Sequence, residues 1–156
     1  MQNYFWKLAE FKYRGQRKFK KLAWKYQRAV KRKELINDLS QIKIDHGSVI
    51  CIHSSLSSLG KVEGGAQTVV SSLTETFKEK ITLMYPTYTL PAGNMEDTLQ
   101  SGFKFDAAKS RTTLGAIPSC IQDSKRFIRS IHPTHSFAAF GPKAKELTKD
   151  HHYAIT

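Results

Sequence analysis

The chain has 156 residues, 40% of them hydrophobic, which suits one domain with a buried core and excludes a wholly disordered or repetitive protein. Its formal net charge is +12, but twelve of the 25 Lys and Arg residues lie in residues 1–33 beside the acid Glu10, so the rest of the chain is nearly neutral. No apolar run could span a bilayer, the N-terminus lacks a signal-peptide core, and Cys51 and Cys120 suit neither a disulfide framework nor a metal site, so we expect a cytoplasmic protein.

Residues 1–33 mix aromatic rings with cations and predict a basic helical extension. Three interpretations stay open for it: packing on the rest of the chain, binding to an anionic membrane surface, and binding to nucleic acid. Tryptophan and tyrosine beside lysine favour the membrane surface over nucleic acid. A peripheral position at the inner membrane surface is therefore an alternative to a freely cytoplasmic one. The apolar stripe of the helix is Phe19, Leu22, Ala23, Tyr26, Ala29 and Val30.

Residues 34–156 predict a single α/β domain. Residues 34–44 predict an amphipathic helix, and Val49 to Ile52 form a continuous apolar run that predicts a strand buried on both faces. Cys51 would then be a small core residue. The polar residues 53–58 follow this strand, and Gly64-Gly65 open a helix whose apolar residues are Val69, Val70, Leu73 and Phe77.

The second half of the chain continues this alternation of strands and helices. It predicts helices on both faces of a central, mostly parallel or mixed sheet. In chain order the expected elements are a strand over 81–86, a loop over 89–104, a helix over 114–121 interrupted near its start by Pro118, strands over 127–131 and 136–140, and a final helix over 141–147.

Three motifs together resemble the aminoglycoside 3-N-acetyltransferase family. They are His-Ser-Ser-Leu-Ser-Ser-Leu-Gly at 53–60, Tyr-Pro-Thr-Tyr-Thr at 85–89, and His-Pro-Thr-His-Ser at 132–136. Phe105-Asp106 and the segment 110–115 resemble a further family pattern, with Ala107 in place of the usual proline. The resemblance covers residues 33–150 and implies transfer of an acetyl group from acetyl-CoA to an amine of an aminoglycoside antibiotic or related amino sugar.

The resemblance also implies where the ligands lie. Acetyl-CoA, the co-substrate, is expected along the loop His53, Ser54, Ser55 and Leu56, with no metal involved; the alternative is that these serines only complete the strand end. The acceptor amine is a small molecule, and a polycationic one needs a carboxylate, for which Asp106 is the best candidate. Three further residues are expected to bind the substrate: Thr87, Tyr88 and Ser136.

His132 and His135 are the candidate catalytic residues, because amine acetylation needs a base. Their spacing across a proline does not place them on one helical face, which disfavours a metal pair. The alternative is that each positions the wall of the site. The resemblance implies that the family's catalytic histidine lies in an Asn-Thr-x-Leu-His segment, which residues 1–156 do not contain. We therefore expect the N-terminal half to two thirds of an acetyltransferase, from a truncated or split reading frame, whose activity alone is an open question.

Two other function classes stay open. One is a non-catalytic remnant that binds CoA or a sugar, and the other is a membrane-surface protein whose working part is residues 1–33. An incomplete sheet would expose an edge that favours association, so an oligomer is also an open expectation.

Overall fold

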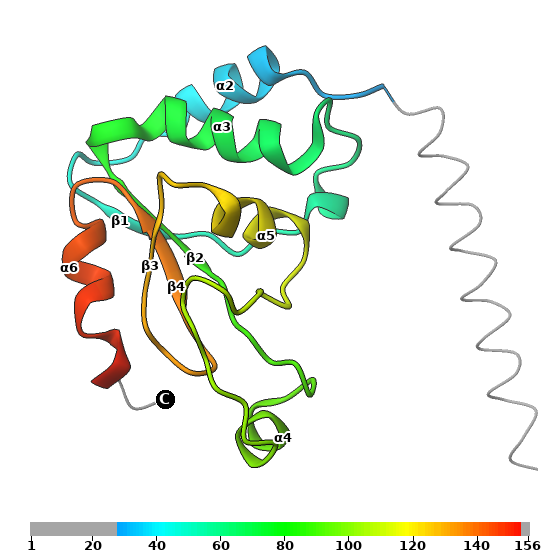
Figure 1. The fold of residues 1–156 in the computed structure, drawn as a ribbon. Helices are drawn as coiled ribbons and strands as arrows, with labels where there is room; N and C mark the ends of the chain where they lie inside the picture. The colour runs from blue at the N-terminus through cyan, green and yellow to red at the C-terminus, as the bar shows by residue number, and fades with distance from the viewer. Residues whose placement is uncertain (1–27, 154–156) are drawn as a thin grey trace, which may run out of the picture.

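A computed structural model describes residues 28–153, which form a mixed four-stranded sheet with helices on both faces (Figure 1). The spatial order is β1-β2-β4-β3. β1 is parallel to β2, whereas β4 is antiparallel to both β2 and β3. The four strands are β1 (Val49–Cys51), β2 (Thr82–Pro86), β3 (Ile128–Arg129) and β4 (Phe137–Phe140).

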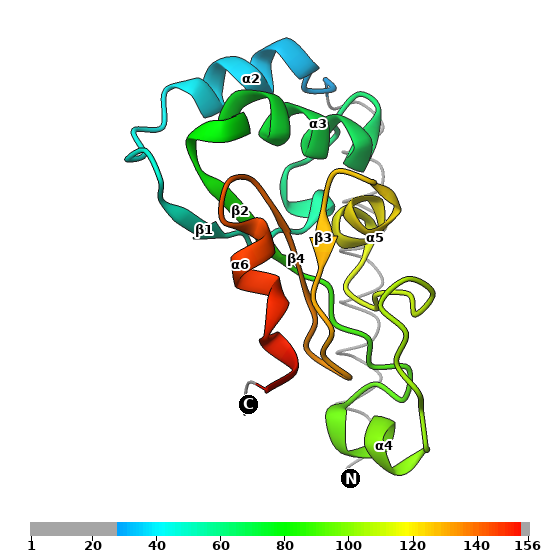
Figure 2. The ribbon, with the colours of Figure 1, turned by 60° about the vertical axis from the view of Figure 1, so that its left-hand side comes forward.

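Two helices pack on one face of the sheet and enclose the core. They are α3 (Gly65–Phe77) and α5 (Ala116–Asp123), and α2 (Arg32–Ser40) packs on α3 (Figures 1 and 2). The helical spacing seen in the sequence of α3 is the spacing that the core requires. The buried cluster consists of Val69, Val70, Leu73, Phe77, Ile81, Leu83, Tyr85, Ile117, Ile121 and Ala138.

The opposite face of the sheet carries α6 (Ala144–Lys149), which is followed by a short 3₁₀ turn, η3 (His151–Tyr153). The Lys143 N–H, at the start of α6, donates to the Thr82 hydroxyl of β2 at 2.9 Å. Ala144 of α6 and Ala139 of β4 are both buried. Helices on both faces of a mixed sheet were predicted from the sequence, and this prediction is confirmed.

The burial predicted for the first strand is wrong. Val49 is 41% exposed and Cys51 is also exposed, while Ile50 and the following Ile52 pack against the core. The reason is that β1 is an edge strand of the described sheet, and α6 packs on β2, β3 and β4 rather than on β1. A continuous apolar run gives no information on whether a strand lies at the centre or at the edge.

Three further helical segments also differ from the prediction. The expected loop over 89–104 contains the helix α4 (Met95–Gln100), capped by Asn94, whose side-chain oxygen accepts the Asp97 N–H at 2.8 Å. α5 is not interrupted by Pro118, since this residue lies in its first turn, where a backbone N–H has no intrahelical partner. The final helix begins at Ala144 instead of residue 141.

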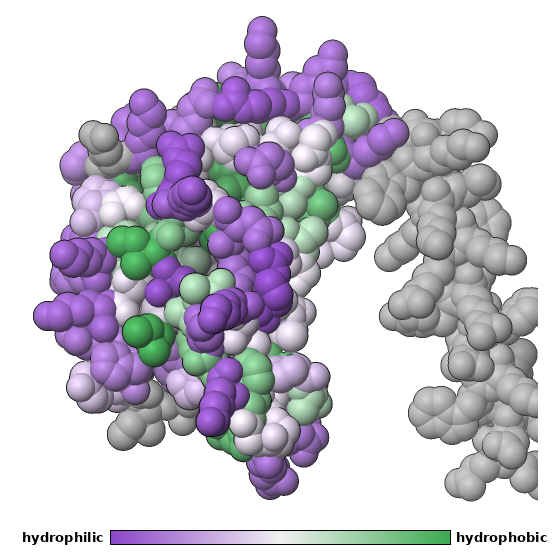
Figure 3. Space-filling model, in the orientation of Figure 1, coloured by the Kyte–Doolittle hydropathy of each residue, from purple (hydrophilic) through white to green (hydrophobic). Residues whose placement is uncertain are grey.

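Residues 1–27, and with them most of the predicted basic extension, lie outside the described part of the chain. Residues 28–31 lead into α2, and Val30 forms a bridge to Val62, so the predicted domain boundary at residue 33 falls inside α2. Between residues 28 and 153, no helix is long and apolar enough to cross a membrane. Figure 3 shows one face of the molecule, with hydrophilic side chains over most of it and apolar side chains scattered among them.

Candidate functional site

The three sequence motifs meet at the end of the sheet where β1 and β2 finish, here called the site end (residues 52–57, 87–89 and 134–136). β1 and β2 are parallel, so both leave the sheet at this end, where the Ile52 N–H donates to the Met84 carbonyl at 2.8 Å. β4 is antiparallel, so the His-Pro-Thr-His-Ser motif enters the sheet there. Two backbone bonds join it to the exit of β2, from Thr87 to Ser136 at 2.8 Å and from Thr89 to Thr134 at 3.0 Å.

The loop after β1 offers unpaired backbone donors. The N–H groups of residues 53–57 donate no hydrogen bond to any residue within 28–153, and neither does the N–H of Tyr88. The Leu56 side chain packs against the core and begins a 3₁₀ turn, η1 (Leu56–Ser58), while the hydroxyls of Ser55 and Ser57 lie 2.8 Å apart. A run of available N–H groups after a strand is an arrangement that binds anionic groups of ligands.

Tyr88 lies at the centre of a cluster of rings. Its ring centroid is 4.5 Å from that of His135 and 5.6 Å from that of Phe137, and both contacts are edge-on. Partial burial raises the pKa of Tyr88, and the nearby Cys51 thiolate adds to this. The Cys51 sulfur in turn lies 3.5 Å from Nε2 of His53. The ring cluster of Tyr88, His135 and Phe137 therefore lies where β2 leaves the sheet and β4 enters it.

The two histidines of the third motif differ in their hydrogen bonds. His132 is buried, and its Nδ1 accepts the backbone N–H groups of Thr134 at 3.3 Å and His135 at 2.9 Å. His135 is half-buried, and its Nδ1 lies 2.8 Å from the Thr134 hydroxyl, whereas its Nε2 has no partner among the described residues. His135 is therefore better placed than His132 to exchange a proton with a ligand.

A third histidine, His151 of η3, joins this cluster and was not among the residues selected from the sequence. The His151 ring centroid lies 4.9 Å from that of His132, and its Nδ1 is 2.8 Å from the Ser130 hydroxyl. Burial lowers the pKa of His151, and the charge of His135 lowers it further. No pattern of residues indicates this contact, because it depends on how α6 packs against the sheet.

Thr87 and Ser136, both predicted to bind substrate, are fully buried. The Thr87 hydroxyl donates to the Ser136 carbonyl at 3.1 Å, and the Ser136 hydroxyl donates to the Thr87 carbonyl at 2.9 Å. Their side chains thus join β2 to β4 beneath the surface. The substrate contact stays a prediction for both residues, and this arrangement favours a supporting role.

Asp106 is exposed and forms a turn with the residues that follow it. Its Oδ1 accepts the N–H groups of Ala108 at 2.8 Å and Lys109 at 3.2 Å, and its other carboxylate oxygen lies 3.7 Å from the Lys109 ammonium. The bond from Ala108 is the main cause that lowers the pKa of Asp106, which is therefore ionised at neutral pH.

Arg129 of β3 is a second residue of this region that was not selected from the sequence. Its guanidinium is half-buried and donates to the Thr87 carbonyl and the Thr89 hydroxyl, which follow β2. It also donates to the Ser136 hydroxyl and to two carbonyls of the turn that begins at Asp106. Burial, with a smaller contribution from Arg111, lowers the pKa of Arg129 to about 10, so it remains charged at neutral pH.

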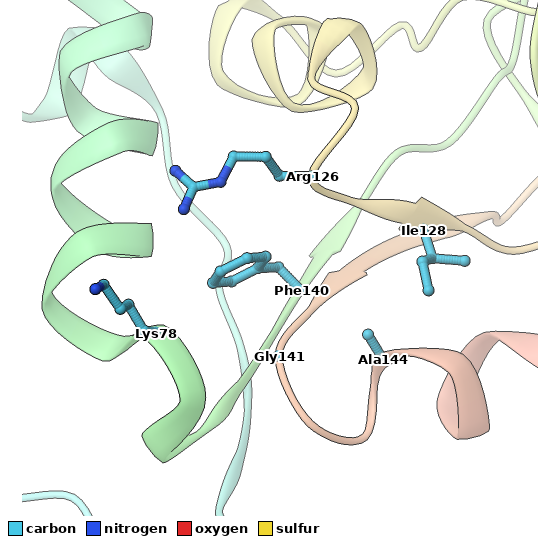
Figure 4. A pocket seen from close by; sticks show the side chains of 6 residues that line it. All are labelled: Lys78, Arg126, Ile128, Phe140, Gly141 and Ala144. Carbon is cyan, nitrogen blue, oxygen red and sulfur yellow. The ribbon is translucent and has the colours of Figure 1, made fainter.

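The opposite end of the sheet, where β2 and β3 begin and β4 finishes, is here called the pocket end (Ile81, Gly141 and the start of β3). It carries a hollow of about 480 Å³. Figure 4 shows the Arg126 side chain beside the Phe140 ring, and its guanidinium carbon lies 5.3 Å from the ring centroid. Six residues line the hollow: Lys78, Arg126, Ile128, Phe140, Gly141 and Ala144. It lies away from the three motifs. Within residues 28–153 no group of three or more His, Cys, Asp or Glu side chains could hold a metal ion.

Comparison with known proteins places these motifs in a family. The family model described as aminoglycoside 3-N-acetyltransferase matches residues 51–156. The chain is 30% identical over 134 residues to aminoglycoside N(3)-acetyltransferase IX of Micromonospora chalcea, a match that covers 78% of this chain and 48% of the relative. It is 34% identical over 125 residues to aminoglycoside N(3)-acetyltransferase III of Serratia marcescens, covering 73% of this chain and 46% of the relative.

Solved structures give the same result. AAC-IIIb in its binary complex with CoASH matches with a TM-score of 0.63 at 25% identity, over 80% of this chain and 50% of that one. AAC-VIa bound to sisomicin matches with a TM-score of 0.66 at 27% identity, over 80% and 50% of the two chains. The chain thus spans about half the length of the relatives that it matches. By its sequence motifs, its fold and these matches, the chain belongs to the aminoglycoside 3-N-acetyltransferase family.

Proposed function

We propose that this chain serves acetyl-CoA-dependent N-acetylation of an amine on an aminoglycoside or related amino sugar. The observation that carries the proposal is the meeting of the three family motifs at the site end of the sheet, where unpaired N–H groups, a ring cluster and an exposed carboxylate lie around the strand exits. Relatives in the family are named for this reaction, and one solved neighbour contains CoASH while another contains sisomicin.

Acetyl-CoA binds along His53–Leu56 in this proposal. The N–H groups of residues 53–57 lack partners among the described residues and can donate to the anionic or carbonyl oxygens of the co-substrate. When an amine attacks a thioester, negative charge develops on the carbonyl oxygen, and fixed N–H donors stabilise that charge. The Tyr88 N–H, at the neighbouring strand exit, is a further donor of this kind.

The acceptor amine lies between Asp106 and the ring cluster. The ionised Asp106 carboxylate attracts a cationic sugar, and the one partner of its outer oxygen among residues 28–153 is the exposed Lys109 ammonium, 3.7 Å away. His135 is the candidate base, since its Nε2 has no partner among residues 28–153 and its ring is held by Tyr88 and Thr134. His132 shapes the loop instead, because two backbone N–H groups occupy its Nδ1.

The test is to incubate the chain with acetyl-CoA and sisomicin, and to measure both free CoA thiol and the mass of the sugar. The proposal expects thiol release together with addition of one acetyl group per acylated amine. Replacing His135 by alanine should lower this rate by about 100-fold, as for loss of a general base. The matched control is His152→Ala, which removes an exposed histidine outside the motifs and should leave the rate unchanged.

Calorimetric titration with CoASH distinguishes an acetyltransferase from a protein that binds CoA without catalysis. Binding of CoASH without acetyl transfer would indicate a non-catalytic binding protein. Absence of both binding and transfer by this chain would overturn the proposal for the polypeptide as given.

A further inference from the structure

We propose that Arg129 is a positioning residue that fixes the turn carrying Asp106 onto the strand exits of the site end. Arg129 holds this turn in place whatever ligand the protein binds. That Asp106 then contacts a cationic sugar rests on the proposed function.

The turn itself is a closed unit of five residues, 106–110. Besides the two bonds to the Asp106 carboxylate, the Ser110 N–H donates to the Asp106 carbonyl at 2.8 Å, and the Ser110 hydroxyl accepts the Asp106 N–H at 2.9 Å. These bonds shape the turn but do not attach it to the sheet, because all of them lie within the turn. Its attachment must come from elsewhere in the molecule.

Arg129 attaches the turn to the strands, and Gln122 of α5 adds a bond from its side-chain N–H to the Ser110 carbonyl at 2.7 Å. The Arg129 Nη1 donates to the Ala107 carbonyl at 3.2 Å and to the Ser110 carbonyl, so it holds both halves of the turn. Its guanidinium carbon also lies 4.9 Å from the centroid of the Phe105 ring, at the entry to the turn. One side chain thus contacts three points along residues 105–110.

The other donors of Arg129 reach the sheet. Nη2 donates to the Thr87 carbonyl at 2.7 Å and to the Thr89 hydroxyl at 2.8 Å, and Nε donates to the Ser136 hydroxyl at 3.1 Å. One planar group therefore links the turn to the exit of β2 and the entry of β4. Among the described residues, none of its partners is a carboxylate.

The absence of a carboxylate partner matters for the site. A carboxylate placed against Arg129 would neutralise its charge, and Asp106 itself is not used for this purpose. Its Oδ1 is held by the turn, while its outer oxygen faces solvent near Lys109. The turn is thus anchored through carbonyls and a ring, and the Asp106 carboxylate remains available to a cationic ligand.

Lysine cannot replace this arrangement. A guanidinium presents five N–H groups in a fixed plane, whereas an ammonium presents three on a flexible stem. Arg129→Lys keeps the charge but loses the fork, so it separates geometry from electrostatics. Arg129→Gln removes both. Arg126→Gln is the matched control, since Arg126 is also an arginine over an aromatic ring but lies at the pocket end.

The experiment uses the full chain and three nuclear magnetic resonance readouts. In both Arg129 variants, amide exchange of Ala108, Lys109 and Ser110 should rise by at least about tenfold, since each lost hydrogen bond is worth about a factor of five to ten. The carboxyl pKa of Asp106, followed by carbon-13 titration, should return toward its ordinary value. The apparent dissociation constant for sisomicin should rise by about tenfold or more. The Arg126→Gln protein should match the wild type in all three measurements.

The Asp106 titration separates positioning from a general loss of stability, because a uniformly weaker but correctly folded domain keeps the turn and its pKa. If Arg129→Gln does not fold, Thr89→Val removes one acceptor and should shift exchange and pKa in the same direction by less. Wild-type exchange and an unchanged Asp106 pKa in Arg129→Lys would overturn the inference. If wild-type protein does not bind sisomicin, the proposed ligand is wrong, and exchange and pKa still decide the role of Arg129.

Discussion

Two arginines only three residues apart, Arg126 and Arg129, lie at opposite ends of the sheet and have different surroundings. Arg129 is half-buried at the site end and donates to oxygens from three separate segments. Arg126 is exposed at the pocket end, where it stacks on Phe140 and donates to the Thr74 hydroxyl at 3.2 Å.

The two ends also differ in how the strands are held together. At the site end backbone bonds join the exit of β2 to the entry of β4, and the Arg129 side chain adds bonds to loops that have no regular structure. At the pocket end the backbone does this work, since Gly141 approaches Ile81 so closely that a side chain there would touch its carbonyl. The difference shows that a hollow in the surface and a site of chemistry need not coincide, because the three motifs gather away from the hollow.

The largest expected loss of stability comes from a substitution at the pocket end. Gly141 has φ +120°, and a Cβ added there would lie 2.3 Å from the Ile81 carbonyl oxygen and 2.9 Å from the Thr82 Cα. Because both neighbours are backbone atoms, Gly141→Ala should cost about 3–4 kcal/mol of unfolding free energy in a urea titration.

Gly115→Ala is the control for this substitution. Gly115 has φ +101° but nothing within 4 Å of the added Cβ, so it incurs conformational strain alone, about 1–2 kcal/mol. Equal losses at the two glycines would show that close approach is not what holds the pocket end.

The next largest loss of stability is expected from a substitution at the site end. Arg129→Gln removes hydrogen bonds to the Ala107 carbonyl, the Thr87 carbonyl and the Thr89 hydroxyl, and should cost about 2–3 kcal/mol of unfolding free energy. Arg126→Gln loses an exposed cation–π contact and one hydrogen bond, and should cost about 0.5 kcal/mol. Urea titration of both variants checks this ratio. Similar losses for the two would remove the distinction drawn between the ends.

The smallest effect is a pH dependence that arises at the site end. The folded-state pKa of His151 lies below its ordinary value of 6.5, so the unfolded chain binds more protons in that interval. This contribution to stability is fully present above pH 6.5 and is lost as the pH falls through the folded-state pKa.

His151→Asn should therefore flatten the fall in the urea midpoint between about pH 7 and pH 5. Replacing the exposed His152 by asparagine should leave the slope as in the wild type. A slope that His151→Asn leaves unchanged would contradict the assignment of this pH dependence to His151.

Sequence patterns predicted the strands and helices that pack on the core, because helical and strand periodicities reflect burial directly. The resemblance implied that residues of the motifs at 53–60, 85–89 and 132–136 serve one function, and the structure brings these segments together at one end of the sheet. The edge position of β1 was missed because Val49 to Cys51 are as apolar as a central strand. The cap at Asn94 and the acids after it were a usable signal for α4.

Arg129 could not have been found in the same way. The residues around it read only as a short strand, and nothing local marks this arginine as different from the many other cations of the chain. Its role depends on carbonyl groups, which every residue has, and on loops whose paths are set by the fold. A partner that is backbone leaves no trace in the sequence of side chains.

The contacts of Arg129 also bear on the order of folding. Its partners at Thr87 and Ala107 lie 42 and 22 residues away along the chain, whereas Ser136 lies 7 residues away across the turn between β3 and β4. Closing long loops costs more entropy than closing short ones, so the β3–β4 hairpin can form early and the anchor only after β2 has docked. Contacts made after the transition state govern the unfolding rate. The side chain that organises the site is then one that slows the opening of the folded domain without hastening its formation.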